Sequence, residues 1–191
     1  MRRFLRDAVI TTFLLGAVAA AFLFAAVHDG GLAATEEPGR LERAVAGSLV
    51  RLSIPAEADR QQNPFSGDSN AWRQVRDHYL DHCAVCHGRD GRGSTEVGKN
   101  MYPKVPDLAS ADVQGRSDGA LFYIIQNGVR WTGMPAWKEA HSAEETWKLV
   151  AWVRKIPTLT EADLEGEGGT GRSGEPASAH PPGTRPHRHR D

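Results

Sequence analysis

The stretch DHCAVCHGRDGRG, residues 81–93, contains both cysteines of the chain, and each stands beside a histidine. His82, Cys83, Cys86 and His87 therefore place two thiols and two imidazoles within six residues. Groups of these types could form a redox-active cysteine pair, a plain disulfide, a zinc site or the attachment point of a covalent haem. The surrounding sequence has to discriminate among these four.

Three of the four interpretations fit poorly. A thioredoxin-like C-x-x-C pair sits at the start of a helix in a βαβ setting, whereas this motif follows a predicted helix in a chain without strand patterning. A structural zinc ion takes four ligands, as a rule in two separated pairs, and here no second cysteine pair exists. A disulfide from Cys83 to Cys86 closes too short a loop to stabilise much and leaves His87 without a role.

The sequence C-x-x-C-H is, in contrast, the attachment signal of c-type haem. The thiols of Cys83 and Cys86 would add to the two vinyl groups as thioethers, and His87 would supply the proximal ligand of the iron. One motif of this kind predicts one covalent haem c.

A low-spin electron carrier needs a second axial ligand, and a thioether is the common choice. Apart from the initiator, only Met101 and Met134 carry one. Met134 stands in NGVRWTGMPAW between Gly133 and Pro135, and this rigid turn could hold the sulfur towards the iron. We therefore predict Met134 as the ligand and expect Met101, nearer the proximal side of the chain, simply to pack.

The elements that must position these groups are helices. The segment 71–86, AWRQVRDHYLDHCAVC, places Trp72, Val75, Tyr79 and Cys83 on one helical face and leads into the cysteine motif. Residues 68–70 offer capping side chains. The loop from 88 to 115 has few large apolar residues, so something other than its own core must organise it.

Two more helices are predicted further along the chain. One begins at Ser117 and ends at Gly128, which suits a left-handed C-terminal cap. The other opens with a capping box, Ser142 with Glu145, and ends at Pro157. No segment alternates convincingly as a strand would, so the predicted fold class is all-α.

Residues 70–159 resemble the class I c-type cytochromes, and in particular small single-haem bacterial domains on a membrane anchor. The resemblance rests on the order helix, CAVCH, VPDL, helix, GMPAW, helix. It implies a small helical domain enclosing a covalent haem, and a proline carbonyl, that of Pro106, accepting the second N–H of His87. It also implies that Tyr79 and Trp152 meet where the first and last helices cross, and that Tyr102 and Trp131 border the haem.

The N-terminal segment is predicted to be a membrane anchor. Residues 8–27 carry no charge and are long enough to cross a bilayer, with Arg2, Arg3 and Arg6 before them and acidic residues after. Positive charge stays on the cytoplasmic side, so the remainder is expected outside the cytoplasm, on the periplasmic face of a bacterial membrane. A signal peptide cleaved near GLAAT is the alternative, and a buried core helix is a third, weaker one.

The expected domains follow from these segments: an anchor at 1–28, a tether at 29–69, the cytochrome c domain at 70–159 and a disordered tail at 160–191. The tether could contain a short helix whose apolar stripe we expect to pack on its own domain; the stripe is Leu41, Val45, Leu49 and Leu52. The tail has too few apolar groups to fold. Its histidines, 180, 187 and 189, are expected to be solvated without a metal role.

The predicted function is electron transfer between ferric and ferrous iron, and not enzymatic catalysis. A net charge of -1 gives no reason to expect nucleic acid, and no small-molecule substrate is expected. The partners would be redox proteins, and the membrane through the N-terminal helix. Two alternatives stay open: an open-site haem sensor or peroxidase using His141 or Arg130, and a haem subunit of a larger oxidoreductase.

Overall fold

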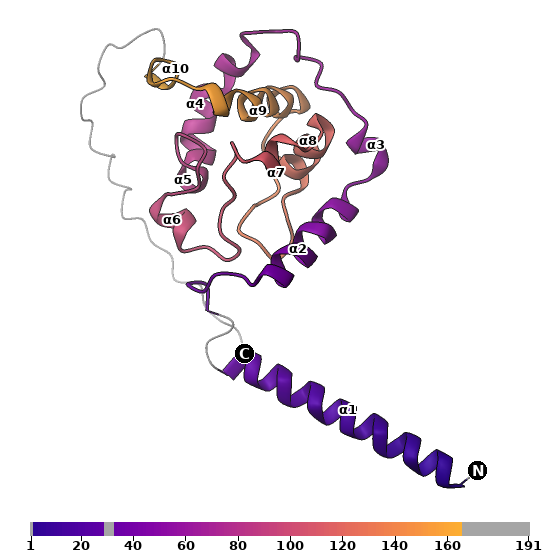
Figure 1. The fold of residues 1–191 in the computed structure, drawn as a ribbon. Coiled ribbons are helices and arrows are strands. Elements are labelled where there is room, and N and C mark those ends of the chain that lie inside the picture. The colour runs from indigo at the N-terminus through magenta and orange to yellow at the C-terminus, as the bar shows by residue number, and fades with distance from the viewer. Residues whose placement is uncertain (1, 29–32, 166–191) are drawn as a thin grey trace, which may run out of the picture. The chain divides into compact units, whose positions relative to one another are not determined.

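The fold is helical, as the sequence predicts. The computed structural model describes residues 2–28 and 33–165, which form helices joined by loops with no strand among them (Figure 1). The chain divides into two compact units, residues 1–159 and 160–191. The helical elements in chain order are α1 (Arg2–His28), α2 (Arg40–Ser53), α3 (Ala56–Asp59), η1 (Ala71–Val75), α4 (Arg76–His78), η2 (Tyr79–Cys83), α5 (Ala84–His87), α6 (Glu96–Lys99), α7 (Ala111–Gln114), α8 (Asp118–Asn127), α9 (Ala143–Lys155), η3 (Ile156–Thr158) and α10 (Glu161–Glu165).

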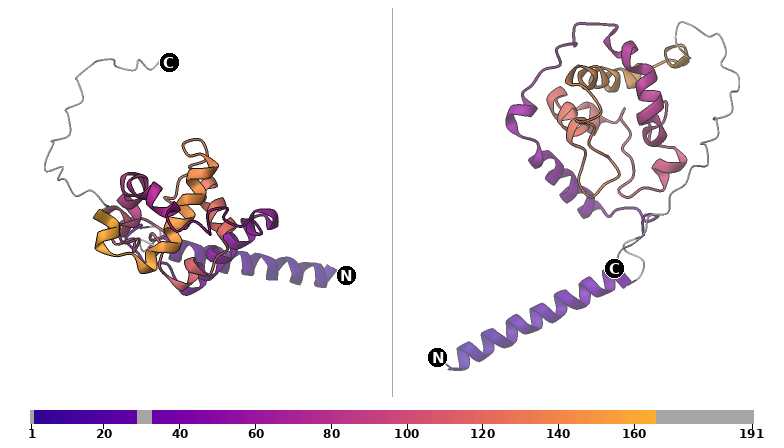
Figure 2. Two further views of the ribbon diagram at one scale, coloured as in Figure 1. Left: turned by 90° about the horizontal axis from the view of Figure 1, so that it is seen from above. Right: turned by 180° about the vertical axis from the view of Figure 1, so that it is seen from behind.

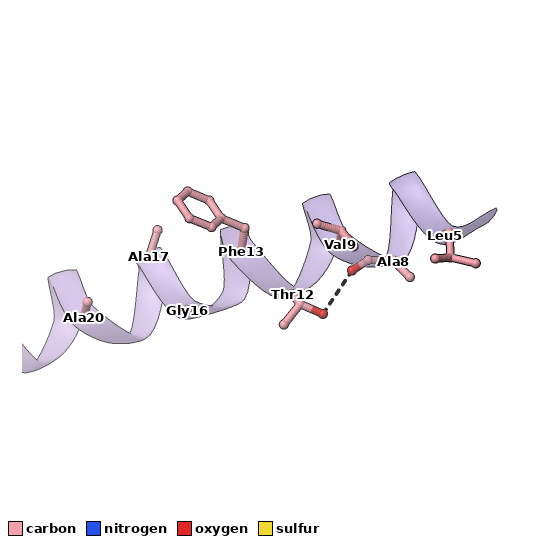
Figure 3. A pocket seen from close by; sticks show the side chains of 8 residues that line it. All are labelled: Leu5, Ala8, Val9, Thr12, Phe13, Gly16, Ala17 and Ala20. Carbon is pink, nitrogen blue, oxygen red and sulfur yellow. Dashed lines mark hydrogen bonds between the residues drawn. The ribbon is translucent and has the colours of Figure 1, made fainter. Parts of the chain in front are cut away.

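Helix α1 is long and apolar enough to cross a membrane over Arg3–Ala25, and none of that span is buried. A core helix of a soluble domain would be buried, so that interpretation of the segment is not supported. A signal sequence passes the same test of length and composition. The hollow on this helix is a shallow surface groove, because all of its lining residues come from α1 itself (Figure 3).

The predicted first helix is present, but it is not uniform. It runs as a 3-10 turn (η1), a short α-helical piece (α4), a π-helical turn (η2) and a last α turn (α5). Trp72, Val75 and Tyr79 are buried as their spacing predicts, and Cys83 is half-buried. A π turn admits one extra residue and is common at functional sites. Here it ends at Cys83, the first residue of the motif.

The core lies where the first helix crosses α9, and the resemblance predicts the residues that meet there. The Trp152 ring lies 5.1 Å from that of Tyr79 and 5.7 Å from that of Trp72, and it is fully buried. Helix α8 packs beside α9, as Figure 1 shows. A buried apolar cluster of Val113, Leu121, Val150 and Val153 joins α7, α8 and α9.

The predicted helix ends are largely confirmed. Ser142 and Glu145 form the capping box of α9, and Ser117 caps α8. Pro157 lies in the 3-10 turn that follows α9. Gly128 ends α8 with a positive φ of 66°, but its ψ of -170° is not that of a left-handed helical cap. Glycine is required there because a Cβ would lie 2.7 Å from the Met134 carbonyl oxygen.

The loop from 88 to 115 contains two single-turn helices that the sequence pattern does not predict. Thr95 caps α6 by accepting from the Gly98 N–H, and Ser110 caps α7 by accepting from the Val113 N–H. A four-residue helix has no repeating apolar stripe, so periodicity cannot find it. The capping side chains are the available signal.

The segment 29–69 differs from the loose tether that the sequence predicts. Its second half is fixed to the domain: Ser117 Oγ donates to Asp59 at 2.6 Å, and the buried Asn63 side chain donates to the Trp147 carbonyl at 2.9 Å. Its first half forms the expected helix, α2. The prediction that the stripe of α2 packs on its own domain is wrong, since all four residues are exposed.

The close packing of α3 on α8 leads to a stability prediction for Gly119→Ala. A Cβ at Gly119 would lie 1.8 Å from the backbone oxygen of Ala58, so the two helices must separate. Overpacking of this kind costs about 1–3 kcal/mol, and we expect chemical denaturation to show a loss of that size. Gly67→Ala is the matched control, because a Cβ there meets nothing within 4 Å. Equal stability of the two variants would contradict the packing of α3 on α8.

The start of the predicted tail is ordered. Residues 161–165 form α10, and Thr160 and Asp163 cap it reciprocally, with the Thr160 N–H donating to Asp163 at 3.0 Å. The expected disorder from residue 160 is therefore wrong for these residues. The rest of the tail, with His180, His187 and His189, lies outside the described residues.

Candidate functional site

The cysteine motif occupies the end of the first helix. Cys83 ends the π turn, while Cys86 and His87 lie in α5. Both thiols are free and half-buried. Burial, with a smaller effect of Cys86, raises the pKa of the Cys83 thiol to about 11, so this thiol is neutral at pH 7. In a haem-bound protein the same two sulfur atoms would be thioethers.

The loop after the motif holds its backbone in place. The Gly93 N–H donates to the His87 carbonyl at 2.7 Å, and the Thr95 hydroxyl donates to the Cys86 carbonyl at 3.1 Å. The Tyr79 hydroxyl donates to the Gly88 carbonyl at 2.9 Å from inside the core. These bonds satisfy the carbonyls at the helix end and fix the direction in which the motif side chains leave it.

His87 has the surroundings expected of a proximal ligand. Its Nδ1 is buried and makes no hydrogen bond of ordinary geometry, yet the Pro106 carbonyl lies close enough to raise the pKa of the imidazole. Burial is the larger influence, and it lowers that pKa. The ring is therefore neutral at pH 7, the state in which imidazole binds a metal. Pro106 itself is exposed on the loop that passes the ring.

Met134 lies half-buried in a turn that is tied to the end of α8. Its carbonyl accepts from the Val129 N–H at 3.1 Å, and its N–H donates to the Thr132 hydroxyl at 3.1 Å. Trp131 takes a positive φ of 59° in this turn and is 88% exposed. The turn thus has a defined conformation, as the flanking glycine and proline predict.

Met101 packs, as expected from the sequence, and its partner lies in the Met134 turn. A Cβ at Gly133 would come 2.1 Å from Met101 Cε, so the Met101 side chain packs on the residue beside Met134. The loop 100–110 therefore contacts the loop 128–141 at this point; Figure 2 gives two further views of the domain that contains both loops. Separation along the chain gave no sign of this contact. Both thioethers therefore lie in the same region of the domain.

A cluster of histidines near the motif was missed by sequence reasoning. His78 and His141 place their Nε2 atoms 2.8 Å apart, and the His82 ring lies 4.6 Å from that of His78. His141 is 6% exposed and stacks on Trp137 with ring centroids 4.7 Å apart. His82 is exposed, as predicted for a residue without a role in the motif. The spacing of four between His78 and His82 was the available signal.

Within residues 2–28 and 33–165, no group of three or more His, Cys, Asp or Glu side chains is placed to hold a metal ion. The four side chains of a zinc interpretation are thus not gathered around one point. His78, His82 and His141 are likewise not placed to hold a metal ion together.

The histidine pair predicts a loss of stability in acid. Burial, as the largest cause, and the neighbouring rings lower the pKa of His78 and of His141 from 6.5, while Glu145 acts on both in the opposite direction. Asp81 also raises that of His78. A lowered pKa in the folded state means that the unfolded chain binds protons first. The stabilisation is complete above pH 6.5 and is lost as the pH falls below it.

Each such histidine contributes a slope of up to about 1.4 kcal/mol per pH unit. We expect the free energy of unfolding of the full chain to fall between pH 7 and pH 5, and to fall less steeply in His141→Gln. Gly67→Ala, which leaves every histidine in place, is the control and should keep the wild-type slope. An identical slope in His141→Gln would contradict the assignment.

The residues present fit a c-type haem. Two half-buried thiols, a neutral imidazole with an orphaned Nδ1 beside a carbonyl, and thioethers on a separate loop are the donor set that such a group requires. Comparison with known families agrees, since residues 70–153 match the family model described as cytochrome C oxidase, cbb3-type, subunit III. The match covers somewhat less than half of the chain and includes every residue of the predicted site. Residues 70–153 are therefore a c-type cytochrome domain, built for electron transfer through haem iron, in a chain that also carries a candidate membrane-spanning helix.

Proposed function

We propose that this chain is an electron-transfer protein with one haem c, bound covalently through Cys83 and Cys86 and ligated by His87 and Met134. The observation that carries the proposal is the C-x-x-C-H motif inside the matched domain, with the Nδ1 of its histidine buried beside the Pro106 carbonyl. The chain has two cysteines, enough for a single motif.

Each proposed residue has a separate task. The haem iron would supply one-electron chemistry, and a thioether ligand favours its ferrous form and raises its potential. In the haem-bound protein, the Pro106 carbonyl would accept from His87 Nδ1, which would orient the ring and strengthen its donation. Gly128 and Thr132 hold the Met134 turn in its conformation. The turn would therefore move little when the haem iron gains or loses an electron.

The contacts of His141 and Arg130 argue against the open-site sensor or peroxidase. Such a site needs a distal histidine or arginine that is free to meet a ligand. His141 is instead paired with His78 and stacked on Trp137, and the Arg130 guanidinium lies over Trp131, 5.9 Å from its ring centroid. We therefore propose a closed, six-coordinate site without a small-molecule substrate.

Spectroscopy of the full chain tests this closed site. We expect a low-spin haem spectrum in both oxidation states and no change when carbon monoxide is added to the reduced protein. A high-spin spectrum, or rapid binding of carbon monoxide, would contradict the closed electron-carrier site and favour the open-site sensor or peroxidase.

We propose that the cytochrome domain works outside the cytoplasm, on the periplasmic face of a bacterial membrane. The three arginines before the apolar span support this orientation. A protein released by signal cleavage would have the domain on the same side. N-terminal sequencing of the membrane-bound protein separates the two, because an anchor retains residue 1 or 2 and a cleaved signal does not.

A place within an oxidase is the second candidate function. The description of the matching family, subunit III of a cbb3-type oxidase, favours it. The domain would then relay electrons to a larger complex rather than diffuse between partners. Purification of the native chain in mild detergent decides between the two. Co-purification of cytochrome c oxidase activity indicates a subunit, and a single-chain species indicates a free carrier.

A further inference from the structure

Helix α2 exposes a continuous apolar stripe. Leu41, Val45, Leu49 and Leu52 follow the helical spacing of four, four and three residues, and their exposed fractions are 78%, 50%, 58% and 81%. The helix has no buried residue. A row of four large apolar side chains in contact with water is unfavourable, and a contiguous patch of this kind marks a binding surface.

The opposite side of α2 contacts the rest of the domain. Val50 lies nine residues after Leu41 and therefore on the opposite face of the helix. It is partly buried, as is Gly47. Arg51 reaches Asp112 at 3.3 Å from the same side. At the edge of the stripe, the Tyr102 hydroxyl donates to Glu42. The four apolar side chains themselves stay exposed, on the side that the domain leaves uncovered.

Position in the chain and charge both point to lipid as the occupant. Helix α1 ends at His28 and α2 begins at Arg40, so the connection spans at most about 40 Å when fully extended. A bilayer that holds α1 is therefore always within reach of α2. The helix carries Arg40, Arg43 and Arg51 against a single acidic residue, Glu42. Arg51 is paired with Asp112 and Arg43 donates to the Pro38 carbonyl, but the net charge of the helix is positive and attracts anionic headgroups.

We propose that α2 lies on the bilayer surface, with the four apolar side chains in the acyl boundary and the net positive charge of the helix attracting anionic lipid. Because the other side of α2 holds the domain, this contact keeps the cytochrome domain at the membrane. The tether then restricts where a redox partner can meet it. The proposal rests on α1 being held in the bilayer and on α2 with its contacts, and it does not depend on which residues ligate the haem.

Spin-label accessibility tests the contact without using thiols. The full chain carries p-acetylphenylalanine at Leu49, or at Glu57 as the control, labelled with a hydroxylamine nitroxide. Glu57 follows α2 and its side chain is 82% exposed. The labelled protein is reconstituted in nanodiscs of phosphatidylethanolamine and phosphatidylglycerol. Collisions with oxygen, which partitions into lipid, and with a water-soluble nickel chelate are then compared.

We expect the oxygen-to-nickel accessibility ratio at position 49 to exceed that at position 57 several-fold, and a label at Leu41 to repeat the high value. An equal ratio at 49 and 57 means that the stripe stays in water and overturns the proposal. Low accessibility to both reagents at 49 also overturns it, since a protein surface would then be the occupant. The optical spectrum of the same sample reports haem attachment, so failure of the haem assignment is seen separately.

Discussion

A chain in which Cys83 and Cys86 are both replaced by alanine is expected to retain no haem after denaturation and to lose most of its folded structure. The thioethers would be the covalent connection, so haem in this variant could be held only by its axial ligands. We expect the domain to depend on the haem, because its own buried apolar core is small. Removing a ligand that is present at 1,000 times its Kd costs about 4 kcal/mol of stability. A covalently attached haem corresponds to a still higher ratio of effective concentration to Kd, so its loss should cost more.

Haem staining of denatured protein and protease resistance of the native protein measure the two effects. His82→Ala is the control, because His82 adjoins the motif, is exposed and has no role in attachment. We expect it to keep its haem and its protease resistance. A cysteine double variant that still carries haem on the denatured chain would refute the attachment assignment.

Met134→Ala is expected to have the second largest effect. Removing the thioether opens the sixth position, so the ferric spectrum should shift to high spin and the reduced protein should bind carbon monoxide. The potential should fall, because axial ligands set it within a range of about 0.8 V. Spectroelectrochemical titration of wild type and variant measures the change.

Met101→Leu is the matched variant, because Met101 packs on Gly133 beside the proposed ligand. Leucine conserves its volume, so a packing role predicts a wild-type spectrum and potential. If Met101→Leu loses the low-spin spectrum and Met134→Ala keeps it, the ligand is Met101. The double variant shows whether one thioether replaces the other when only one is removed.

The site was predictable from sequence where its residues are adjacent. C-x-x-C-H fixes the identity and order of three groups by covalent spacing, and the capping box of α9 fixes where that helix begins. These features depend on interactions within a few residues, which a sequence states directly. The same is true of the all-α class, since apolar periodicity depends on local geometry.

Contacts between distant segments were not predictable in this way. Met101 beside Gly133 and His78 beside His141 depend on how loops and helices meet, and no local pattern encodes either. The prediction that the apolar stripe of α2 packs on its own domain was wrong for a related reason. Periodicity shows that a helix has an apolar face, but it does not show which surroundings cover that face.

The central claim is one covalent haem c on this chain. Mass spectrometry of the full chain under denaturing conditions, after expression with export and haem maturation, tests it most directly. We predict a polypeptide mass increased by that of one haem, with the haem-bearing peptide spanning Cys83 and Cys86. A mass equal to that of the polypeptide alone, in a chain that folds and reaches the membrane, would contradict the account.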